Sequence, residues 1–341
     1  MPSPVGRLGP LLHPAWIPAE GASRPAVRAK EGDVHSDNAI ETHRLTKRYG
    51  SRTAVEGLSI VVPYGVVAGF IGPNGAGKTT TMSMLLGLTS PSDGGGAVLG
   101  RPLREPAAYL RQVGALIERP AFYPGLSGEE NLRLLATVGG HDPARIGDLL
   151  DLVGLADRGG DRFGAYSLGM KQRLGIAAAL LGDPALLILD EPANGLDPAG
   201  IHEMRRLLSD LADGGRTIFV SSHILAELEQ VCDWLVIIDR GALVFQGSKR
   251  ELLDSAAAGL VVATEREGDL ARLRHSLLER GRRVELRGES LRVDVDGADP
   301  RAVAAEVSRA AMAQGAVIVE LRLERTNLEE RYLEITNGGN R

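Results

Sequence analysis

Residues 66–88, VVAGFIGPNGAGKTTTMSMLLGL, carry the strongest indication of the fold of this chain. Its first part, residues 66–72, is an apolar run of the length of a buried strand, and residues 78–88 have the composition of a helix. Between them, GPNGAGKT fits the pattern G-x-x-x-x-G-K-S/T of a phosphate-binding loop. Glycines let such a loop turn its N–H groups inward, toward phosphate oxygens. The stretch therefore predicts a strand, a phosphate-binding loop and a helix.

The residues of this loop are suited to a nucleoside triphosphate. Lys78 supplies positive charge to the β and γ phosphates, and Thr79 offers a hydroxyl to Mg²⁺. The helix that follows presents its positive N-terminal end to the same phosphates. We therefore predict a nucleoside triphosphate site with Mg²⁺, formed by Gly72, Pro73, Asn74, Gly75, Ala76, Gly77, Lys78, Thr79 and Thr80.

The chain around the loop alternates between strands and helices over residues 38–254. LLILDEP precedes PAGIHEMRRLLSDLADGG, and TIFVSS precedes ILAELEQVCD. This alternation is typical of βαβ units on a largely parallel sheet, so the predicted class is α/β. Near the start, AIETHRLTKRYG alternates like an edge strand that ends in a turn.

The two ends of the chain differ from this central region. Residues 1–37 are rich in Pro, Gly and Ala without a period, which predicts a disordered N-terminal extension. Residues 255–341 predict a small α+β domain in the order β-α-β-β-α-β, as in ferredoxin-like modules. A short helix, NLEERYLEIT, is predicted to close the chain.

An acidic pair, Asp190 and Glu191, ends the apolar run LLILDEP. One carboxylate at the end of a strand can hold Mg²⁺, and a second beside it can polarise an attacking water. The commoner alternative is a cap on the following helix. With a phosphate-binding loop upstream, the pattern favours a metal ligand at Asp190 and a general base at Glu191.

Taken in order, these motifs resemble the ATP-binding cassette family over about residues 40–250. YSLGMKQRLGIA is similar to the family signature, with Ser167, Gly169 and Gln172 in the expected places. The resemblance implies a P-loop NTPase cassette with a mixed, largely parallel sheet. It also implies a dimer, here a homodimer, in which the signature serine and glycine contact the γ-phosphate bound by the other protomer.

Four further residues take their predicted roles from the resemblance. His223 in SSHIL resembles the switch histidine that bonds the γ-phosphate, and Asp197 ends a loop, NGLD, that crosses to the partner. Tyr49 falls where the family stacks an aromatic ring on adenine, although a turn tyrosine is the alternative. Glu118 departs from the family, which usually has Gln there; its carboxylate still suits Mg²⁺ but adds negative charge beside the γ-phosphate.

Composition limits the partners and the location. The formal net charge of -5 gives no general attraction to nucleic acid, and no apolar run approaches the ~20 residues of a spanning helix. We expect a cytoplasmic protein held at the inner face of the cell membrane by a separate permease, with no nucleic-acid partner. Residues 118–130, including Phe122 and Tyr123, are the expected permease contact, unless those aromatic rings belong to the core.

The resemblance implies an ATP-binding and ATP-hydrolysing subunit of an ABC transporter. LIERPAFYPGL and EPANGLDPAGI look most like the branch that serves bacitracin, lantibiotic and drug export. The alternatives are a soluble cassette ATPase that acts on ribosomes or DNA, an importer ATPase, and a cassette that binds ATP without hydrolysis. A single cassette without a heptad stretch weighs against the ribosome or DNA alternative, and an α-containing tail weighs against the importer ATPase. The intact residues Lys78, Asp190, Glu191 and His223 weigh against a cassette that does not hydrolyse ATP.

Overall fold

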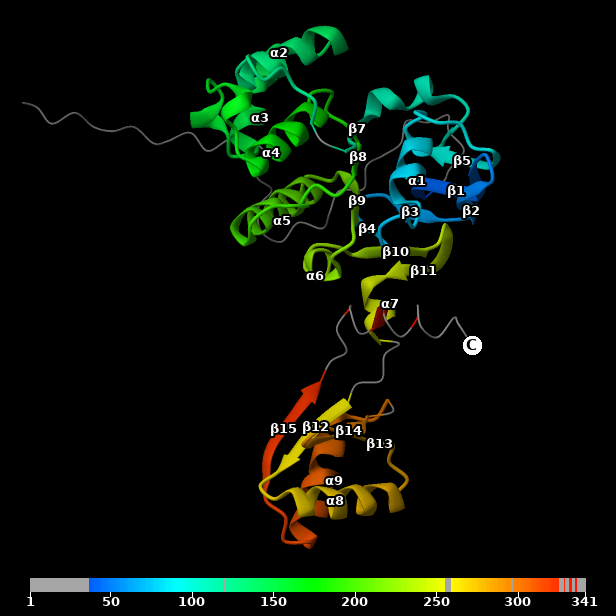
Figure 1. Cartoon of the computed structure of the whole chain (residues 1–341), viewed down its shortest axis with the longest axis vertical. Helices are drawn as coiled ribbons and strands as arrows, with labels where there is room; N and C mark the ends of the chain where they lie inside the picture. Colours follow the sequence, from blue (N-terminus) through cyan, green and yellow to red (C-terminus); the bar gives the residue numbers. More distant parts are fainter. Residues whose placement is uncertain are drawn as a thin grey trace, which may run out of the picture.

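The computed structural model describes residues 37–118, 120–254, 259–295 and 297–324, together with residues 328, 331, 332 and 335. The predicted N-terminal extension, residues 1–37, lies outside the described residues except for Asp37. Figure 1 shows two bodies, which are called the cassette region (residues 38–254) and the C-terminal module (residues 259–324).

The central sheet of the cassette region has the strand order β11-β10-β4-β9-β8-β7 in the described part of the chain. Every neighbouring pair is parallel except β10 with β11, which are antiparallel. The predicted mixed, largely parallel sheet is therefore confirmed. Its strands are β4 (Val67–Ile71), β7 (Val113–Leu116), β8 (Leu186–Leu189), β9 (Thr217–Ser222), β10 (Trp234–Asp239) and β11 (Ala242–Ser248).

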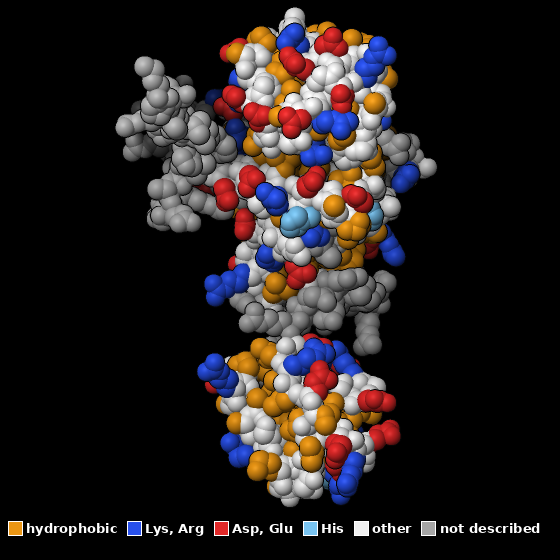
Figure 2. Space-filling model, turned by 90° about the vertical axis from the view of Figure 1, so that its left-hand side faces the viewer, with side chains coloured by type: hydrophobic (Ala, Val, Ile, Leu, Met, Phe, Trp, Pro, Cys, Tyr) orange, Lys and Arg blue, Asp and Glu red, His pale blue; other side chains and the backbone are white. Residues whose placement is uncertain are grey.

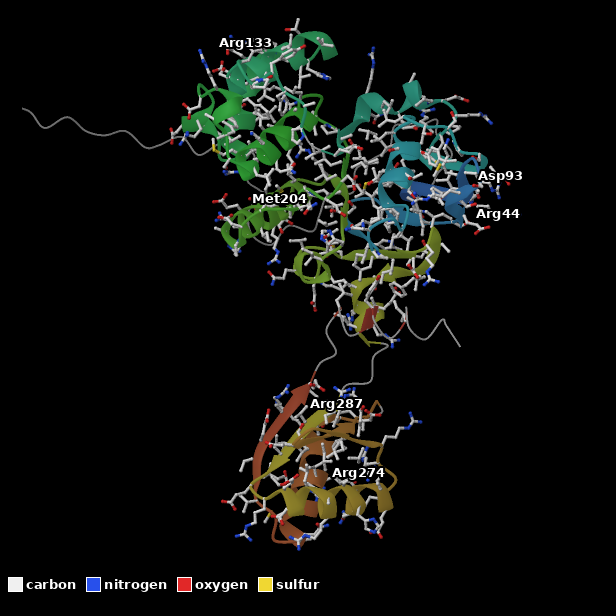
Figure 3. All side chains as sticks on the ribbon, in the orientation of Figure 1. Arg44, Asp93, Arg133, Met204, Arg274 and Arg287 are labelled. Carbon is white, nitrogen blue, oxygen red and sulfur yellow. The ribbon has the colours of Figure 1, made fainter. Side chains whose placement is uncertain are left out.

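A smaller antiparallel sheet stands beside the first, and in it β1 pairs with β2, β3 and β5. The prediction of an edge strand at residues 39–50 is thus wrong. Alternation reports which face of a strand is buried but not how many strands flank it. The glycine-rich β5 packs closely: a Cβ at Gly96 would lie 2.2 Å from the carbonyl oxygen of Glu41. The strands are β1 (Asn38–Tyr49), β2 (Arg52–Leu58), β3 (Val61–Pro63), β5 (Asp93–Val98) and β6 (Arg101–Pro102). Arg44 and Asp93 mark one end of this sheet in Figure 3.

The helices of the cassette region cover both faces of the central sheet (Figure 1). Strand β8 illustrates this, because Leu186 and Ile188 join the core cluster that contains β1 and α1, while Leu187 and Leu189 join the cluster that contains α4 and α5. A strand buried on both faces reads as a continuous apolar run. The helices are α1 (Lys78–Leu85), α2 (Gly128–Gly139), α3 (Ile146–Leu152), α4 (Leu168–Ala179), α5 (Pro198–Asp213), α6 (Leu225–Leu228) and α7 (Lys249–Asp254), with 3₁₀ turns at Pro106–Ala108, Leu110–Gln112, Pro143–Arg145, Ala156–Arg158 and Phe163–Ala165.

The C-terminal module has the element order β-α-β-β-α-β and the sheet order β13-β14-β12-β15. Two helices pack on one face of this sheet, and the module has an apolar cluster of its own (Figure 1). This is the topology of a ferredoxin-like module, as the sequence predicts. The elements are β12 (Gly259–Thr264), α8 (Glu267–Glu279), β13 (Val284–Arg287), β14 (Ser290–Asp294), α9 (Pro300–Ala313) and β15 (Ile318–Glu324).

After β15 the chain returns to the cassette region. Leu328 is fully buried and belongs to a core cluster of that region, and Tyr332 and Ile335 pack against the same cluster. These residues are helical and recur at the spacing of one helix face, within the predicted NLEERYLEIT helix, most of which lies outside the described residues. The division at residue 254 therefore stays a prediction, and the last described residues add to the cassette core. In the described part of the chain, no helix combines the length and the hydropathy needed to cross a bilayer.

Candidate functional site

The loop between β4 and α1 is shaped to receive an anion. Gly75 and Gly77 have φ values of 83° and 104°, in the left-handed region that favours glycine. A Cβ on Gly77 would lie 2.6 Å from the carbonyl oxygen of Ala54. No side chain caps the N-terminus of α1, so its first N–H groups remain available to a ligand. The loop lines a cavity of about 150 Å³ together with Arg52 and Ala54 of β2.

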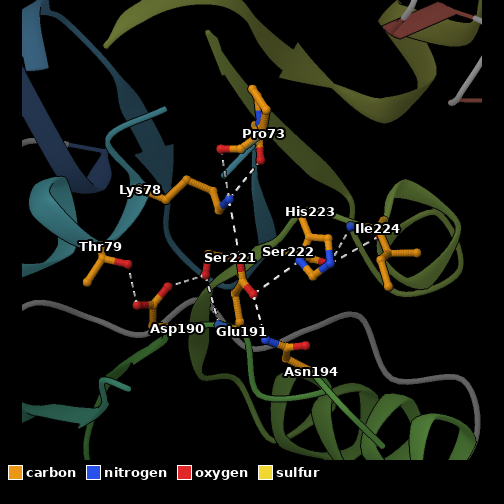
Figure 4. A network of polar contacts seen from close by, with 11 residues as sticks. Pro73, Lys78, Thr79, Asp190, Glu191, Asn194, Ser221, Ser222, His223 and Ile224 are labelled. Carbon is orange, nitrogen blue, oxygen red and sulfur yellow. Dashed lines mark hydrogen bonds and ion pairs between the residues drawn. The ribbon is translucent and has the colours of Figure 1, made fainter. Parts of the chain in front are cut away.

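Lys78 lies folded over this loop. Its side chain is almost fully buried, and Nζ donates hydrogen bonds to the carbonyl oxygens of Gly72 (2.7 Å) and Pro73 (3.4 Å). The same ammonium lies 3.3 Å from Oε1 of Glu191 (Figure 4). A buried ammonium between the phosphate-binding loop and a carboxylate is positioned to neutralise the negative charge of a phosphate bound in the loop.

Asp190 lies at the carboxyl end of β8 and meets Thr79 across the site. Thr79 Oγ1 donates to Oδ2 of Asp190 at 2.6 Å, and Ser221 Oγ donates to Oδ1 at 2.5 Å. Asp190 is 7% exposed and Ser221 is fully buried. The structure therefore brings together Thr79 and Asp190, the two residues to which the sequence assigned Mg²⁺. Hydroxyl and carboxylate oxygens suit Mg²⁺, and the metal role of both residues stays a prediction.

Glu191 has a left-handed backbone (φ 47°), which is uncommon for a residue with a side chain and is frequent at functional sites. Its N–H donates to Ser221 Oγ at 2.8 Å. Its Oε2 accepts from Asn194 Nδ2 at 3.1 Å and lies 3.1 Å from His223 Nδ1 (Figure 4). The predicted base and the predicted switch histidine are thus in direct contact.

Glu118 follows β7 and also has a left-handed backbone (φ 59°). With Thr79, Asp190 and Glu191 it lines a cavity of about 590 Å³. Its place in the metal site stays a prediction, which this shared cavity supports. In the described residues, no cluster of three or more His, Cys, Asp or Glu side chains could hold a metal alone.

The signature segment borders the same cavity. Ser167 is the N-cap of α4, is exposed, and accepts a hydrogen bond from the N–H of Met170 at 3.3 Å. Gln172 lines the cavity and is buried, and its Oε1 has no hydrogen-bond partner among the described residues. A buried amide oxygen without a partner is costly unless a ligand or water reaches it. The role of Ser167, Gly169 and Gln172 in nucleotide binding stays a prediction, which this position beside the cavity supports.

Tyr49 lies at the margin of the phosphate loop rather than inside it. It pairs with Arg52 in the β1–β2 hairpin, and Arg52 lines the loop cavity. The ring is 51% exposed, with Lys47 Nζ 5.0 Å from its centroid. An exposed ring at this margin is available to stack on a base, and that role stays a prediction.

Ser221 and Asn194 are the site residues that sequence reasoning missed. Ser221 contacts both Asp190 and Glu191. Strands β8 and β9 pair with Leu189 opposite Val220, so the residues that follow these two, Asp190 and Ser221, lie next to each other. The signal available in the sequence was a polar pair, Ser221 and Ser222, at the end of the apolar run TIFV. The order of strands in the sheet was not predicted, so a contact between these serines and the acidic pair could not be predicted either.

Comparison with known proteins gives the following similarities. A family model described as "ABC transporter" matches residues 55–194. The bacitracin transport ATP-binding protein BcrA of Enterococcus faecalis is 48% identical over 216 residues, which cover 62% of this chain and 70% of that protein. The uncharacterized ABC transporter ATP-binding protein YhcH of Bacillus subtilis (strain 168) is 39% identical over 303 residues, covering 87% of this chain and 95% of YhcH. A solved structure of an ATP-binding subunit of an ABC transporter superposes with a TM-score of 0.57 at 35% identity, covering 64% of this chain and 92% of that one.

Proposed function

Because the chain belongs to the ABC transporter family and is an ATP-hydrolysing subunit of such a transporter, we propose that it powers export of an antimicrobial peptide or drug through a separate permease. The resemblance predicted from the motifs is confirmed, and the similarity to transport proteins favours transport over an action on ribosomes or DNA. One observation supports the ATPase mechanism. The side chains that meet at the carboxyl ends of the interior strands β4, β8 and β9 are those of Lys78, Thr79, Asp190, Glu191 and His223.

The first step is binding of the triphosphate. The N–H groups of the loop and of the first turn of α1 would receive the phosphate oxygens. Lys78 would shift its ammonium from the carbonyl oxygens of Gly72 and Pro73 to the phosphates, a stronger charge-assisted contact. Tyr49 would stack on the base at the margin of the loop.

The second element is the metal. Thr79 and Asp190 would hold Mg²⁺, and their 2.6 Å contact shows that two hard oxygen donors already meet there. When bound, Mg²⁺ would supply positive charge that neutralises the negative charge developing during phosphoryl transfer. Glu118 would offer a further oxygen from the other wall of the shared cavity.

The third element is activation of the attacking water. Glu191 would accept the proton of a water in line with the γ-phosphate. Asn194 and His223 hold one carboxylate oxygen of Glu191, and the Ser221 hydroxyl holds its backbone N–H. His223 would then bond the γ-phosphate.

A second protomer would complete the site. Ser167 is exposed at the N-terminus of α4, where N–H groups and the helix dipole favour an anion. It would contact the γ-phosphate bound by a partner cassette, as Gly169 would, and Asp197 would lie in the loop that reaches across. The working unit would be a homodimer with two ATP molecules between its cassettes.

The permease contact is proposed at the segment after β7 and on α2. Tyr123 is 63% exposed, and Leu134, Leu135 and Val138 form an exposed apolar strip on α2. Phe122, which was expected to share this contact, packs instead against the core, with its ring 5.0 Å from that of Phe163. Through this contact the chain would lie at the inner face of the cell membrane.

The test is export in a living host. The chain would be coexpressed with a candidate transmembrane permease in a bacitracin-sensitive strain, and growth inhibition by bacitracin and by a lantibiotic would be measured. We expect higher tolerance for one of them, lost in Glu191→Gln. Equal sensitivity with and without the pair, while the purified chain hydrolyses ATP, would refute the export of this class of cargo but not the ATPase.

A further inference from the structure

The outer edge of β15 is an exposed strand edge in the C-terminal module. β15 ends the sheet order β13-β14-β12-β15, and among the described residues no strand pairs with its far side. A free edge presents unpaired N–H and C=O groups, which act as a template for another strand. The strand is seven residues long, within the usual range for a paired strand.

The strand β15, IVELRLE, alternates exposed apolar side chains with charged ones. Val319, Leu321 and Leu323 are 63%, 37% and 38% exposed, and Val317 just before the strand is exposed as well. In Figure 2, apolar side chains gather on the face of the module that contains β15. Edge strands are commonly protected by charges, Pro or bulges. Here one bulge, at Val319, lies near the start of the strand and leaves residues 320–324 in regular pairing with β12.

The charges on β15 are self-complementary in an antiparallel arrangement. If two copies of β15 pair about a two-fold axis at Leu321, then Glu320 of each copy faces Arg322 of the other, and Val319 faces Leu323. A centre at Arg322 would oppose two arginines and two Glu320–Glu324 pairs, and a centre at Glu320 would oppose two glutamates. Opposite charges across strands stabilise a pair and like charges destabilise it, so the charges exclude the centres at Arg322 and Glu320. A centre at Leu323 would also oppose Arg322 to Glu324, but it would overlap only residues 322–324 of the strand, whereas the centre at Leu321 pairs all seven residues of β15. At present Glu320 and Arg322 pair within their own strand at 2.6 Å.

We propose that the C-terminal module is a self-association module in which β15 of two chains pair antiparallel about Leu321. The partner is a second copy of this chain, and the two four-stranded sheets join into one. The pairing is isologous and so has two-fold symmetry, the same type of symmetry as the proposed cassette dimer. This inference goes beyond the ATPase function, because the pairing needs no nucleotide and would keep two cassettes at high effective concentration between hydrolysis cycles.

The test is a symmetric disulfide in the full chain. The protein has one cysteine, Cys232, which is fully buried, so Leu321→Cys introduces the reactive thiol. Directly opposed residues in antiparallel strands have Cα atoms about 4.5–5.5 Å apart, within reach of a disulfide. The nucleotide-free protein, with EDTA present, would be oxidised with copper phenanthroline and its dimer yield followed by non-reducing electrophoresis. The matched control is Leu286→Cys on β13, the opposite edge of the sheet, where the side chain is 58% exposed.

We expect the Leu321→Cys protein to form a crosslinked dimer at least about tenfold faster than the control. Charge reversal then tests the register in the same background: Glu320→Arg or Arg322→Glu alone should slow crosslinking about tenfold, and the two together should restore it. Equal rates for Leu321→Cys and Leu286→Cys, or no recovery in the double reversal, would overturn the proposal. Crosslinking of Leu321→Cys to a coexpressed permease instead of to itself would also overturn it. ATP hydrolysis is measured on the same samples, so the proposed function is judged separately.

Discussion

Replacing Ser221 with alanine removes one hydroxyl that serves both acidic residues of the site. The hydroxyl is fully buried, donates to Asp190 at 2.5 Å and accepts from the N–H of Glu191 at 2.8 Å. A hydrogen bond to a charged group contributes about 1.5–3 kcal/mol, and a buried N–H left without a partner costs about 1–3 kcal/mol. The two terms overlap, so we expect Ser221→Ala to lose about 3 kcal/mol of unfolding free energy.

The same change should impair turnover more than nucleotide binding. Without Ser221 the Glu191 backbone loses the contact that holds its left-handed conformation, and displacement of a catalytic group by about 1 Å can cost about 100-fold in rate. The phosphate loop is not touched, so KM for ATP should change little. Unfolding in urea and steady-state phosphate release measure the two effects on the same preparation.

Ser222→Ala is the matched control. Its hydroxyl accepts from the N–H of Ile224 and donates to the same residue's carbonyl, so it fixes a local turn. We expect a loss of about 1 kcal/mol and a kcat within a few-fold of the native value. If Ser221→Ala retains native kcat, or if both variants behave alike, then Ser221 does not position the acidic pair.

Four further outcomes follow from the structure. Glu191→Gln should abolish turnover, retain ATP binding and accumulate an ATP-dependent dimer in size-exclusion chromatography; native turnover would remove Glu191 from the role of base. Lys78→Ala should weaken ATP binding, measured by calorimetry, and unchanged affinity would contradict the assignment of the loop. Leu328→Ala should lower the unfolding free energy of the cassette region by about 2–5 kcal/mol in urea, and an effect as small as that of an exposed leucine would show that the closing segment contributes nothing to this core. The hydrogen bond and charge of Arg282 hold the pKa of Glu306 below its ordinary value, so this pair stabilises the fold above about pH 4.3 and the contribution disappears as the pH falls through the lowered pKa. Glu306→Gln should therefore be less stable than the native chain by about 1 kcal/mol near neutral pH and equal to it in acid, and a pH-independent difference would contradict the ion pair.

Much of the fold was readable from local patterns. The glycine-rich loop between an apolar run and a helix predicts a strand, a turn and a helix, because the φ values of Gly75 and Gly77 and the burial of β4 are properties of a short segment. The order β-α-β-β-α-β in residues 259–324 was equally readable, since each element is bounded by turn residues. Local patterns failed for β1, because its partner β5 lies about 50 residues away and is too rich in glycine to resemble a strand.

The candidate site divides in the same way. Lys78 and Thr79 were predictable from the phosphate-binding pattern itself. Asp190, Glu191 and His223 became predictable only through their order after that loop, which resembles the order in the family. Ser221 and Asn194 have no such signal, since a serine after a strand and an asparagine in a turn are common. Their importance comes from what they contact, and the contact between Ser221 and the acidic pair depends on β9 lying between β4 and β8.

Local patterns were enough to identify a phosphate-binding loop, an acidic strand end and a signature segment in the order of an ATP-binding cassette. Hydrophobic periodicity and glycine spacing are local, so they can be recognised without knowledge of the fold. The three-dimensional arrangement was needed to learn that Glu191 contacts both Lys78 and His223, that Leu328 packs in the cassette core, and that β15 has an open edge among the described residues. Each of these depends on strand order and on contacts between distant segments, which packing of the whole chain selects and which no local pattern encodes.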